Sequence, residues 1–309
     1  LTSGGRPVLL VPGPFWEQED ARIPRGTNLL FRKEEQTMDI RLIALDLDGT
    51  LLDSRKCLSQ RNYEALQACM RRGIEIVPCT GRIWQGVPDF IREMPGIHYA
   101  ITINGAMVGD VQTGEILDQR KFPVETALEI LELARSFRTM YDAYAGGQAF
   151  GEARFMDHME EYGIPVQLQS MVRATRQVVP DVIAHVRQLN QPVEKINYFF
   201  GDMEERMRAK RELEKREDLV LSASYPHNLE INTPGATKGE ALNRLAEYLG
   251  LSREQTMGFG DGENDVTMMT MSGLGVAMSN GMDAVKQVAD YITTSNDEDG
   301  VAAAIEKYV

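Results

Sequence analysis

The sequence predicts an α/β fold in which a doubly wound parallel sheet is interrupted by an inserted α+β domain. The run from Arg41 to Leu45 shows no polar alternation, which is typical of a strand buried on both faces of a parallel sheet. Strand and helix patterns alternate near both ends of the chain but not between them. We therefore expect residues 38–116 and 230–309 to form one sheet domain and residues 117–229 to form the insertion.

The first part of the sheet domain predicts a βαβαβ unit. After the opening strand, Ser59 is placed to cap a helix whose apolar residues recur at helical spacing until Gly73 stops it. A second strand is predicted at residues 74–79 and a third at residues 100–103. Parallel strands joined in this way almost always wind right-handed, so an open α/β sheet follows.

The last part of the chain repeats this pattern. The predicted elements are a helix at residues 238–249, strands at residues 256–259, 274–277 and 290–293, and a helix that begins at Gly300. The insertion differs, with charged helices predicted at residues 124–136 and 203–216 and strands at residues 195–200 and 219–224. We expect the insertion to act as a lid on the sheet domain.

Residues 1–37 differ in composition from the rest of the chain. They are rich in Pro, Gly and Arg, lack apolar periodicity and do not begin with methionine. The codons of Lys33, Glu34 and Glu35 could form a purine-rich stretch that resembles a bacterial ribosome-binding site, shortly before Met38. We expect residues 1–37 to be disordered or non-native and hypothesise that Met38 is the native start. N-terminal sequencing of the native protein would test this hypothesis.

The composition excludes several classes of protein. With 46 acidic and 33 basic side chains the net charge is -13, which repels nucleic acid. The apolar runs are far shorter than the roughly 20 residues that span a bilayer. The cysteines, Cys57, Cys69 and Cys79, are odd in number and fit reduced thiols. We expect a cytoplasmic protein without nucleic-acid or membrane partners, either monomeric or weakly homo-oligomeric.

Asp46 and Asp48 follow the opening strand directly, in the sequence DLDGT. Residues two apart in an extended chain face the same way, and open α/β sheets bind ligands at the carboxyl ends of their strands. Two carboxyl groups this close resist joint ionisation unless a cation compensates them, which suits one nucleophile and one acid. Taken alone, the residues are explained equally well by a strand-ending turn at Gly49.

A second acidic group, GDGEND at residues 260–265, also begins where a predicted strand stops. It contributes Asp261 and Asp265 without a neighbouring His or Cys, and such hard oxygen ligands predict Mg²⁺. A Ca²⁺ loop is disfavoured because the stretch is short and apolar helix residues follow it at once. Both acidic groups are expected at one edge of the sheet.

Two further sets of residues could bind an anion at this edge. Thr80, Gly81 and Arg82 end the second strand and offer a hydroxyl and backbone N–H groups. Lys238 opens its helix and could neutralise the anion with its ammonium group. Each alone is better explained as a helix cap or a solvated lysine, but their convergence predicts one pocket.

Four motifs resemble, in order and context, those of haloacid dehalogenase-superfamily phosphatases: DLDGT at residues 46–50, the Thr80-Gly81-Arg82 turn, Lys238 and GDGEND at residues 260–265. Two details further resemble the Cof-type subgroup (subclass IIB): Asn104-Gly105 and Leu229-Glu230-Ile231. In that subgroup an α/β cap of the C2 type is inserted between the second and third motifs. The resemblance covers Met38–Val309 and implies a Rossmann-like core with a cap.

The resemblance implies a phosphatase that works through an aspartyl-phosphate. Asp46 would be the nucleophile, and Asp48 the acid that protonates the leaving oxygen and then the base that activates water. Mg²⁺ would be held by the Asp46 carboxylate, the Asp48 backbone carbonyl and Asp261, with Asp265 either a direct ligand or a residue that supports the ligands. The residues expected to hold the phosphoryl group are Thr80, Gly81, Lys238 and Asn264.

The expected substrate is a small phosphorylated metabolite such as a sugar phosphate. The cap should close over the site and contact the leaving group. Tyr141, Tyr144, Arg154 and His158 are candidates for this contact, although solvated helix or loop positions explain each more simply. A phosphomutase, or a catalytically silent protein that senses a phosphorylated metabolite, remains an alternative.

Overall fold

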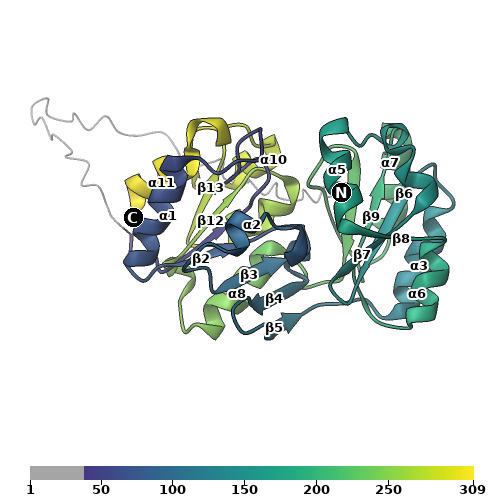
Figure 1. Ribbon diagram of the computed structural model, residues 1–309, viewed down its shortest axis with the longest axis horizontal. Helices are drawn as coiled ribbons and strands as arrows, with labels where there is room; N and C mark the ends of the chain where they lie inside the picture. The colour runs from purple at the N-terminus through teal and green to yellow at the C-terminus, as the bar shows by residue number, and fades with distance from the viewer. Residues whose placement is uncertain (1–37) are drawn as a thin grey trace, which may run out of the picture. The chain divides into compact units, whose positions relative to one another are not determined.

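The computed structural model describes residues 38–309, so the expectation for residues 1–37 lies outside the described residues. A five-stranded parallel sheet forms the part drawn around β12 and β13 in Figure 1. Its order is β14 (Tyr291–Ile292), β13 (Leu274–Ala277), β12 (Thr256–Gly260), β1 (Leu42–Leu45) and β2 (Glu75–Pro78). Helices cover both faces of this sheet, which confirms the predicted doubly wound α/β fold.

All four residues of β1 are buried, because each face of the strand packs against helices. The helices around this sheet are α1 (Gln60–Arg71), α2 (Asp89–Arg92), α8 (Lys238–Tyr248), α9 (Val266–Met271), α10 (Asp283–Val288) and α11 (Gly300–Tyr308). Leu42 and Ala44 share a cluster with side chains of α8, α9 and α10. Ile43 and Leu45 share another with side chains of α1 and α11. Burial on both faces explains the unbroken apolar run.

The observed limits of these elements are close to the predicted ones. The Ser59 side chain caps α1 by accepting a hydrogen bond from the backbone N–H of Asn62 at 3.1 Å. Gly73, with a φ of 76°, adopts the left-handed conformation just after the helix. The strand predicted at residues 290–293 is shorter in the structure, where β14 has two residues.

The third predicted strand has a different environment from the one expected. β3 (Tyr99–Thr102) touches the end of β2 through a single parallel bridge between Cys79 and Ile101. It belongs to a three-stranded antiparallel sheet with β4 (Met107–Asp110) and β5 (Ile116–Gln119), which the sequence did not predict. The turn after β3 places Asn104 in the left-handed region, with a φ of 60°.

The cap sheet is a second, six-stranded sheet. Its order is β10 (Val220–Ser222), β11 (Asn228–Asn232), β9 (Val193–Phe199), β6 (Met140–Ala145), β7 (Gln148–Glu152) and β8 (Arg176–Val179). Only the β7–β8 pair in this sheet is parallel. The accompanying helices are α3 (Val124–Ala134), α4 (Ala153–Met156), α5 (Val166–Thr175), α6 (Val182–Leu189) and α7 (Met203–Leu213). The predicted mixture of helices and strands is therefore present.

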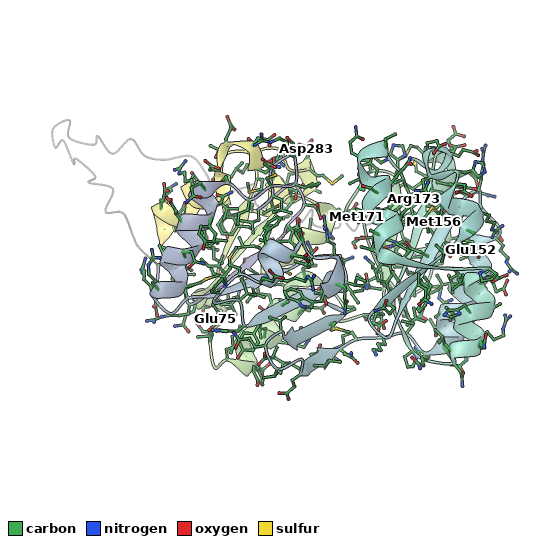
Figure 2. The ribbon with its side chains drawn as sticks, in the orientation of Figure 1. Glu75, Glu152, Met156, Met171, Arg173 and Asp283 are labelled. Atoms are coloured by element: carbon green, nitrogen blue, oxygen red, sulfur yellow. The ribbon has the colours of Figure 1, made fainter. Side chains whose placement is uncertain are left out.

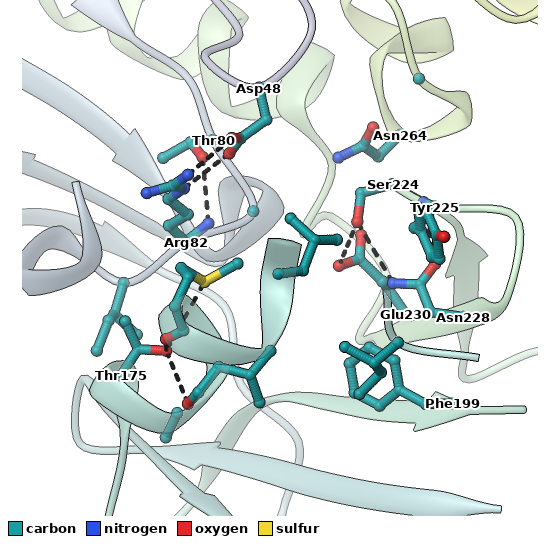
Figure 3. A pocket seen from close by; sticks show the side chains of 18 of the residues that line it. Asp48, Thr80, Arg82, Thr175, Phe199, Ser224, Tyr225, Asn228, Glu230 and Asn264 are labelled. Carbon is teal, nitrogen blue, oxygen red and sulfur yellow. Dashed lines mark hydrogen bonds and ion pairs between the residues drawn. The ribbon is translucent and has the colours of Figure 1, made fainter. Parts of the chain in front are cut away.

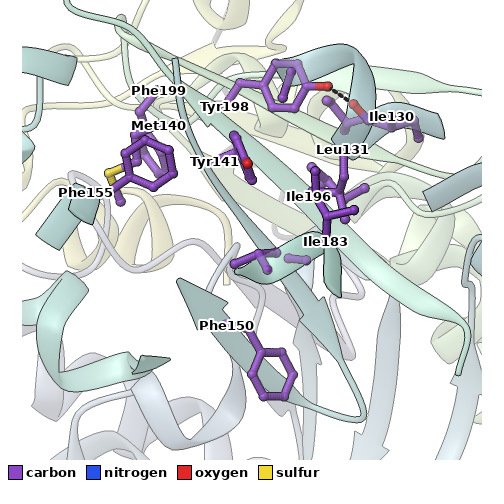
Figure 4. Packing of buried hydrophobic residues seen from close by; sticks show 14 of the residues in the cluster. Ile130, Leu131, Met140, Tyr141, Phe150, Phe155, Ile183, Ile196, Tyr198 and Phe199 are labelled. Atoms are coloured by element: carbon purple, nitrogen blue, oxygen red, sulfur yellow. Dashed lines mark hydrogen bonds between the residues drawn. The ribbon is translucent and has the colours of Figure 1, made fainter. Parts of the chain in front are cut away.

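The two faces of the cap sheet differ in chemistry. Helices α3 and α6 cover an apolar face, where Leu131 and Ile183 lie among the buried residues with Ile196 of β9 (Figure 4). Tyr198, also on β9, donates a hydrogen bond to the backbone carbonyl of Ile130 in this core. Because side chains alternate along a strand, the residues between these positions point the other way.

The opposite face of the cap sheet is polar although it is buried. It carries Asp142 and Tyr144 on β6, Lys195 and Asn197 on β9, and Glu230 on β11. Side chains pack between each of these sheets and the helices that cover it (Figure 2). Within the described residues, none of the helices combines the length and hydrophobicity that a membrane span requires.

Candidate active site

The structure brings the two predicted acidic groups together at the carboxyl edge of the parallel sheet. Asp46 follows β1 and Asp261 follows β12, and these two strands pair in parallel register. Asp265 lies where the chain enters α9. One carboxylate oxygen from each of Asp46, Asp261 and Asp265 lies within 4.8 Å of the other two. Neighbouring parallel strands therefore produce the convergence that the sequence predicted.

Lys238 lies beneath this cluster and is fully buried. Thr237 caps α8 and places Lys238 at its first position. The Lys238 Nζ atom is 2.6 Å from Asp46 Oδ1 and 2.5 Å from Asp265 Oδ1. Burial alone would lower the pKa of Lys238, but the charges of Asp265 and Asp46 raise it well above its ordinary value. The lysine is therefore an ammonium ion that bridges two carboxylates.

The remaining charge of the cluster suits a divalent cation. Burial raises the pKa of Asp46 well above its ordinary value; the charge of Lys238 opposes this effect, and Asp265 and Asp261 add to it. Burial and the charge of Asp265 likewise raise the pKa of Asp261 to about 6. Three acidic groups face one ammonium, and the raised pKa values of Asp46 and Asp261 mark negative charge that the ammonium does not compensate. Hard oxygen donors are what Mg²⁺ and related ions prefer. The residues present therefore fit a divalent metal site.

Two loops hold these carboxylates in place. Thr50 Oγ1 donates a hydrogen bond to Asp261 Oδ1 at 2.8 Å. Gly49, with a φ of 86°, lies so close that a Cβ atom there would overlap the Asp261 carboxylate. Asp265 Oδ2 accepts hydrogen bonds from the backbone N–H groups of Asp261 and Gly262, both at 2.9 Å. The short GDGEND loop thus folds back on its own last aspartate.

Asp48 faces the same cavity but has cationic partners. Arg82 Nε and Nη2 donate to its two carboxylate oxygens, each at 2.7 Å, and Lys56 Nζ is 2.8 Å from Oδ1. Burial alone would raise the pKa of Asp48, but these cations lower it to about 2. The sequence singled out Arg82 as part of an anion-binding turn; the structure shows that its guanidinium binds Asp48.

One cavity of about 420 Å³ joins the predicted residues to the cap (Figure 3). Its lining includes six of the predicted site residues: Asp46, Asp48, Thr80, Gly81, Asp261 and Asn264. Lys238 and Asp265 lie behind this lining, fully buried. The cap contributes polar residues of its sheet, among them Tyr144 and Lys195, and apolar residues of α5, among them Leu168 and Met171.

The four cap candidates fall in different places. Tyr144 lines the cavity, and its hydroxyl accepts a hydrogen bond from Arg176 Nη2 at 2.9 Å. Tyr141 and Arg154 line a second cavity of about 520 Å³ on the other side of the cap sheet. His158 pairs with Glu161 at 3.2 Å on the surface. Of the four, only Tyr144 is among the residues that line the cavity beside the carboxylates.

Several polar residues around the cavity were not predicted to take part in the site. The sequence indicates no role for Lys56, Arg176 and Lys195, because it does not reveal which lysines and arginines face the cavity. Asn104 and Glu230 were noted only as details of the family resemblance. Their side chains meet at 2.7 Å across 126 positions of the chain.

Comparison with known proteins agrees with this geometry. The haloacid dehalogenase-like hydrolase family model matches residues 43–305. Phosphatase YwpJ of Bacillus subtilis (strain 168) is 32% identical over 279 residues, which cover 85% of this chain and 98% of YwpJ. The 5-amino-6-(5-phospho-D-ribitylamino)uracil phosphatase YcsE of the same strain is 29% identical over 276 residues, covering 89% and 98%. A solved haloacid dehalogenase-like hydrolase from B. subtilis has a TM-score of 0.76 at 30% identity, covering 86% and 99%.

The parallel sheet, the acidic cluster at its edge and the inserted cap define a phosphate-ester hydrolase of the α/β class. The chain belongs to the haloacid dehalogenase-like hydrolases and is a Cof-type (subclass IIB) phosphatase. The resemblance found in the sequence motifs is confirmed.

Proposed function

We propose that this phosphatase uses Mg²⁺ to hydrolyse a small phosphomonoester, a sugar phosphate or a related compound, through an aspartyl-phosphate on Asp46. The observation that carries the proposal is the meeting of Asp46, Asp261 and Asp265 within 4.8 Å of one another, beside the cavity that Asp48 lines. This arrangement supports a nucleophile, a proton carrier and a cation site that act on one phosphorus atom. Such transfer depends mainly on positioning and electrostatics.

The metal ligands would be the Asp46 carboxylate, the Asp48 backbone carbonyl, Asp261 and Asp265. The excess of carboxylate over ammonium charge supports this set. When bound, Mg²⁺ would offset the negative charge that accumulates on the transferring phosphoryl group. Thr80, Gly81, Lys238 and Asn264 would hold the phosphoryl oxygens. Three of them line the cavity, whereas the Nζ atom of Lys238 contacts Asp46 behind the lining and would have to move to reach a phosphoryl oxygen.

The two aspartates divide the chemistry into two steps. In the first, an oxygen of Asp46 bonds to phosphorus while the bond to the leaving oxygen breaks, and Asp48 gives that oxygen a proton, which requires Asp48 to have left Arg82 and taken up a proton beforehand. In the second, Asp48 takes a proton from water as the water oxygen attacks phosphorus. The bond to Asp46 then breaks, which restores its carboxylate and releases inorganic phosphate.

We also propose that residues 117–229 form the cap that selects the leaving group and residues 38–116 and 230–309 the catalytic core, except that residues 117–119 of β5 stay with β3 and β4 and residues 230–232 of β11 belong to the cap sheet. The cavity supports this division, because its phosphate end is lined from the parallel sheet and its other end from β9 and α5. The name of the relative YcsE describes a substrate that carries a 5-phospho-D-ribityl group. Such a phosphorylated polyol supports the choice of sugar phosphates and their relatives.

The test is phosphate release by the purified protein from p-nitrophenyl phosphate and a panel of phosphorylated metabolites, with Mg²⁺ and with EDTA. Metal-dependent release is expected, and Asp46→Asn should abolish it in a protein that keeps its circular dichroism spectrum and melting temperature. Substantial turnover by folded Asp46→Asn would overturn the assignment of Asp46 as the nucleophile. Transfer to a second hydroxyl would identify a mutase, and binding without turnover a sensor.

A further inference from the structure

Two of the residues proposed to hold the phosphoryl group are joined by a chain of buried polar side chains that passes through the cap sheet. Asn264 Nδ2 donates a hydrogen bond to Asn104 Oδ1 at 3.1 Å, and Asn104 Nδ2 donates to Glu230 Oε2 at 2.7 Å. Lys195 Nζ donates to Glu230 Oε1 at 3.2 Å and to the backbone carbonyl of Gly81 at 2.7 Å. Glu230 therefore connects Asn264 to Gly81 through these hydrogen bonds; Figure 3 shows Glu230 and Asn264 beside the cavity.

These four hydrogen-bonded side chains are shielded from water. The exposed fractions are 8% for Asn264, 2% for Asn104, 4% for Glu230 and 1% for Lys195. Burial alone would raise the pKa of Glu230, but the charge of Lys195 and the hydrogen bond from Asn104 lower it. Glu230 is therefore a carboxylate, and a buried charge needs these partners.

Because Glu230 is a carboxylate, it determines which atom donates and which accepts in the hydrogen bonds of Asn104 and Asn264. Ionised Glu230 only accepts, so Asn104 must present its amide nitrogen to it and its amide oxygen to Asn264. Asn264 must then also present its nitrogen, which keeps its remaining N–H available to the cavity. An amide at position 230 could donate as well as accept, and the direction would be lost.

The backbone conformation at Asn104 and the absence of a side chain at Gly81 allow these hydrogen bonds to form. Asn104 has a φ of 60° and a ψ of 29°, a left-handed conformation that asparagine tolerates better than most residues. A Cβ atom at Gly81 would lie 2.8 Å from Asn104 Oδ1, which is closer than real Cβ contacts. Glycine at position 81 therefore lets the phosphate-binding turn approach Asn104.

We propose that Glu230 is a positioning residue that orients Asn264 through Asn104 and fixes the Gly81 carbonyl through Lys195. The inference rests on the proposed function, because it assigns Glu230 to the phosphate pocket of that reaction. Lys195 and Glu230 lie on strands of the cap sheet, β9 and β11. The cap sheet therefore organises the binding of the phosphoryl group as well as that of the leaving group.

The first experiment compares Glu230→Gln with Glu152→Gln in the Mg²⁺-loaded protein. Glu152, labelled in Figure 2, is 2% exposed on β7 and pairs with Arg154 at 2.5 Å, so it matches Glu230 in burial and in having a cationic partner but lies away from the phosphate pocket. Glu230→Gln should weaken competitive inhibition by inorganic phosphate about tenfold and raise KM more than it lowers kcat. Glu152→Gln should leave both unchanged. Equal phosphate inhibition in both variants would overturn the inference.

The second experiment restores the direction of the hydrogen bonds. Asn104→Asp added to Glu230→Gln lets the new amide donate to a carboxylate that still accepts from Asn264, and aspartate also tolerates the left-handed backbone. Phosphate inhibition should return to within about threefold of the unsubstituted protein. Failure of this rescue would overturn the orienting role.

Two further measurements keep the inference testable. If Glu230→Gln does not fold, Asn104→Gly breaks the chain next to Asn264, keeps the left-handed backbone and leaves the Lys195 ion pair intact. It should weaken phosphate inhibition by the same factor, and an unchanged value would overturn the inference. Calorimetric binding of phosphate tests positioning without turnover, so a protein that binds phosphate but hydrolyses no ester contradicts the proposed function alone.

Discussion

Arg82 holds the carboxylate of Asp48 with two hydrogen bonds, from Nε to Oδ2 and from Nη2 to Oδ1, each 2.7 Å long. With Lys56 also at 2.8 Å, the pKa of Asp48 is about 2, although burial alone would raise it. In this arrangement Asp48 is ionised, which is the form that accepts a proton from water. In the proposed reaction, Asp48 would have to leave Arg82 before it could carry a proton to a leaving oxygen.

Replacing Arg82 with Met should raise the pKa of Asp48 by at least about one unit, because an adjacent cation lowers a carboxyl pKa by roughly 1–3 units. The carboxyl group would then be largely protonated between pH 2 and its new pKa, where it is now ionised. Carbon-13 NMR of aspartate-labelled protein, assigned with Asp48→Asn, follows this titration. Arg41→Met, which removes the surface pair with Asp39, is the control and should leave the Asp48 resonance unchanged.

Lys238→Met should lower the free energy of unfolding in EDTA by about 3–5 kcal/mol, because it leaves the carboxylates of Asp46 and Asp265 without their buried cation. Mg²⁺ should stabilise this variant more than the unsubstituted protein, since a second cation replaces the lost charge. Urea unfolding with and without Mg²⁺ measures both effects. Lys286→Met, which removes a pair with the exposed Asp283 at 3.6 Å, should cost under about 1 kcal/mol.

Magnesium affinity should fall as the pH drops below about 6, the value to which burial and Asp265 raise the pKa of Asp261. Above this pH Asp261 is a carboxylate that binds the metal, and below it the group is protonated and binds poorly. Binding near pH 6 should therefore release a proton. Calorimetry in two buffers of different ionisation enthalpy detects the release, and Asp261→Asn should reduce it. An affinity that is constant from pH 5 to pH 7 would contradict this assignment.

A single thiol should react in the folded protein. Cys57 is exposed, whereas Cys69 and Cys79 are buried. Burial raises the pKa of Cys69 to about 11 and that of Cys79 further, so neither forms the reactive thiolate at neutral pH. Ellman's reagent should titrate one thiol before unfolding and three in denaturant, and Cys57→Ser should remove the fast reaction. Rapid reaction of all three thiols in the native protein would contradict this packing.

The part of the site that lies at strand ends could be predicted from the sequence. Asp46 and Asp261 follow β1 and β12, and parallel strands end at a common edge, so local patterns were enough to bring them together. The series of hydrogen bonds that links the side chains of Asn264 and Lys195 could not be predicted in this way. Asn104 and Glu230 are 126 positions apart, and their contact depends on how the cap sheet meets the turn after β3.

The cap residues show a second limit of sequence reasoning. Tyr141 and Tyr144 are three positions apart on β6, so their side chains point to opposite faces. The sequence did not predict β6, and both tyrosines therefore had equal standing as substrate contacts. In the structure Tyr144 lines the cavity, whereas Tyr141 packs among the residues under α3 and α6.

The alternation along β6 has a consequence for substitutions in this strand. Ala143 belongs to the apolar interior of the cap, while its neighbour Tyr144 borders the cavity. Neighbouring residues of one strand thus have separate roles, since Ala143 stabilises the interior of the cap and Tyr144 shapes the wall of the cavity. A substitution at position 144 therefore alters the cavity without removing a side chain from the apolar interior.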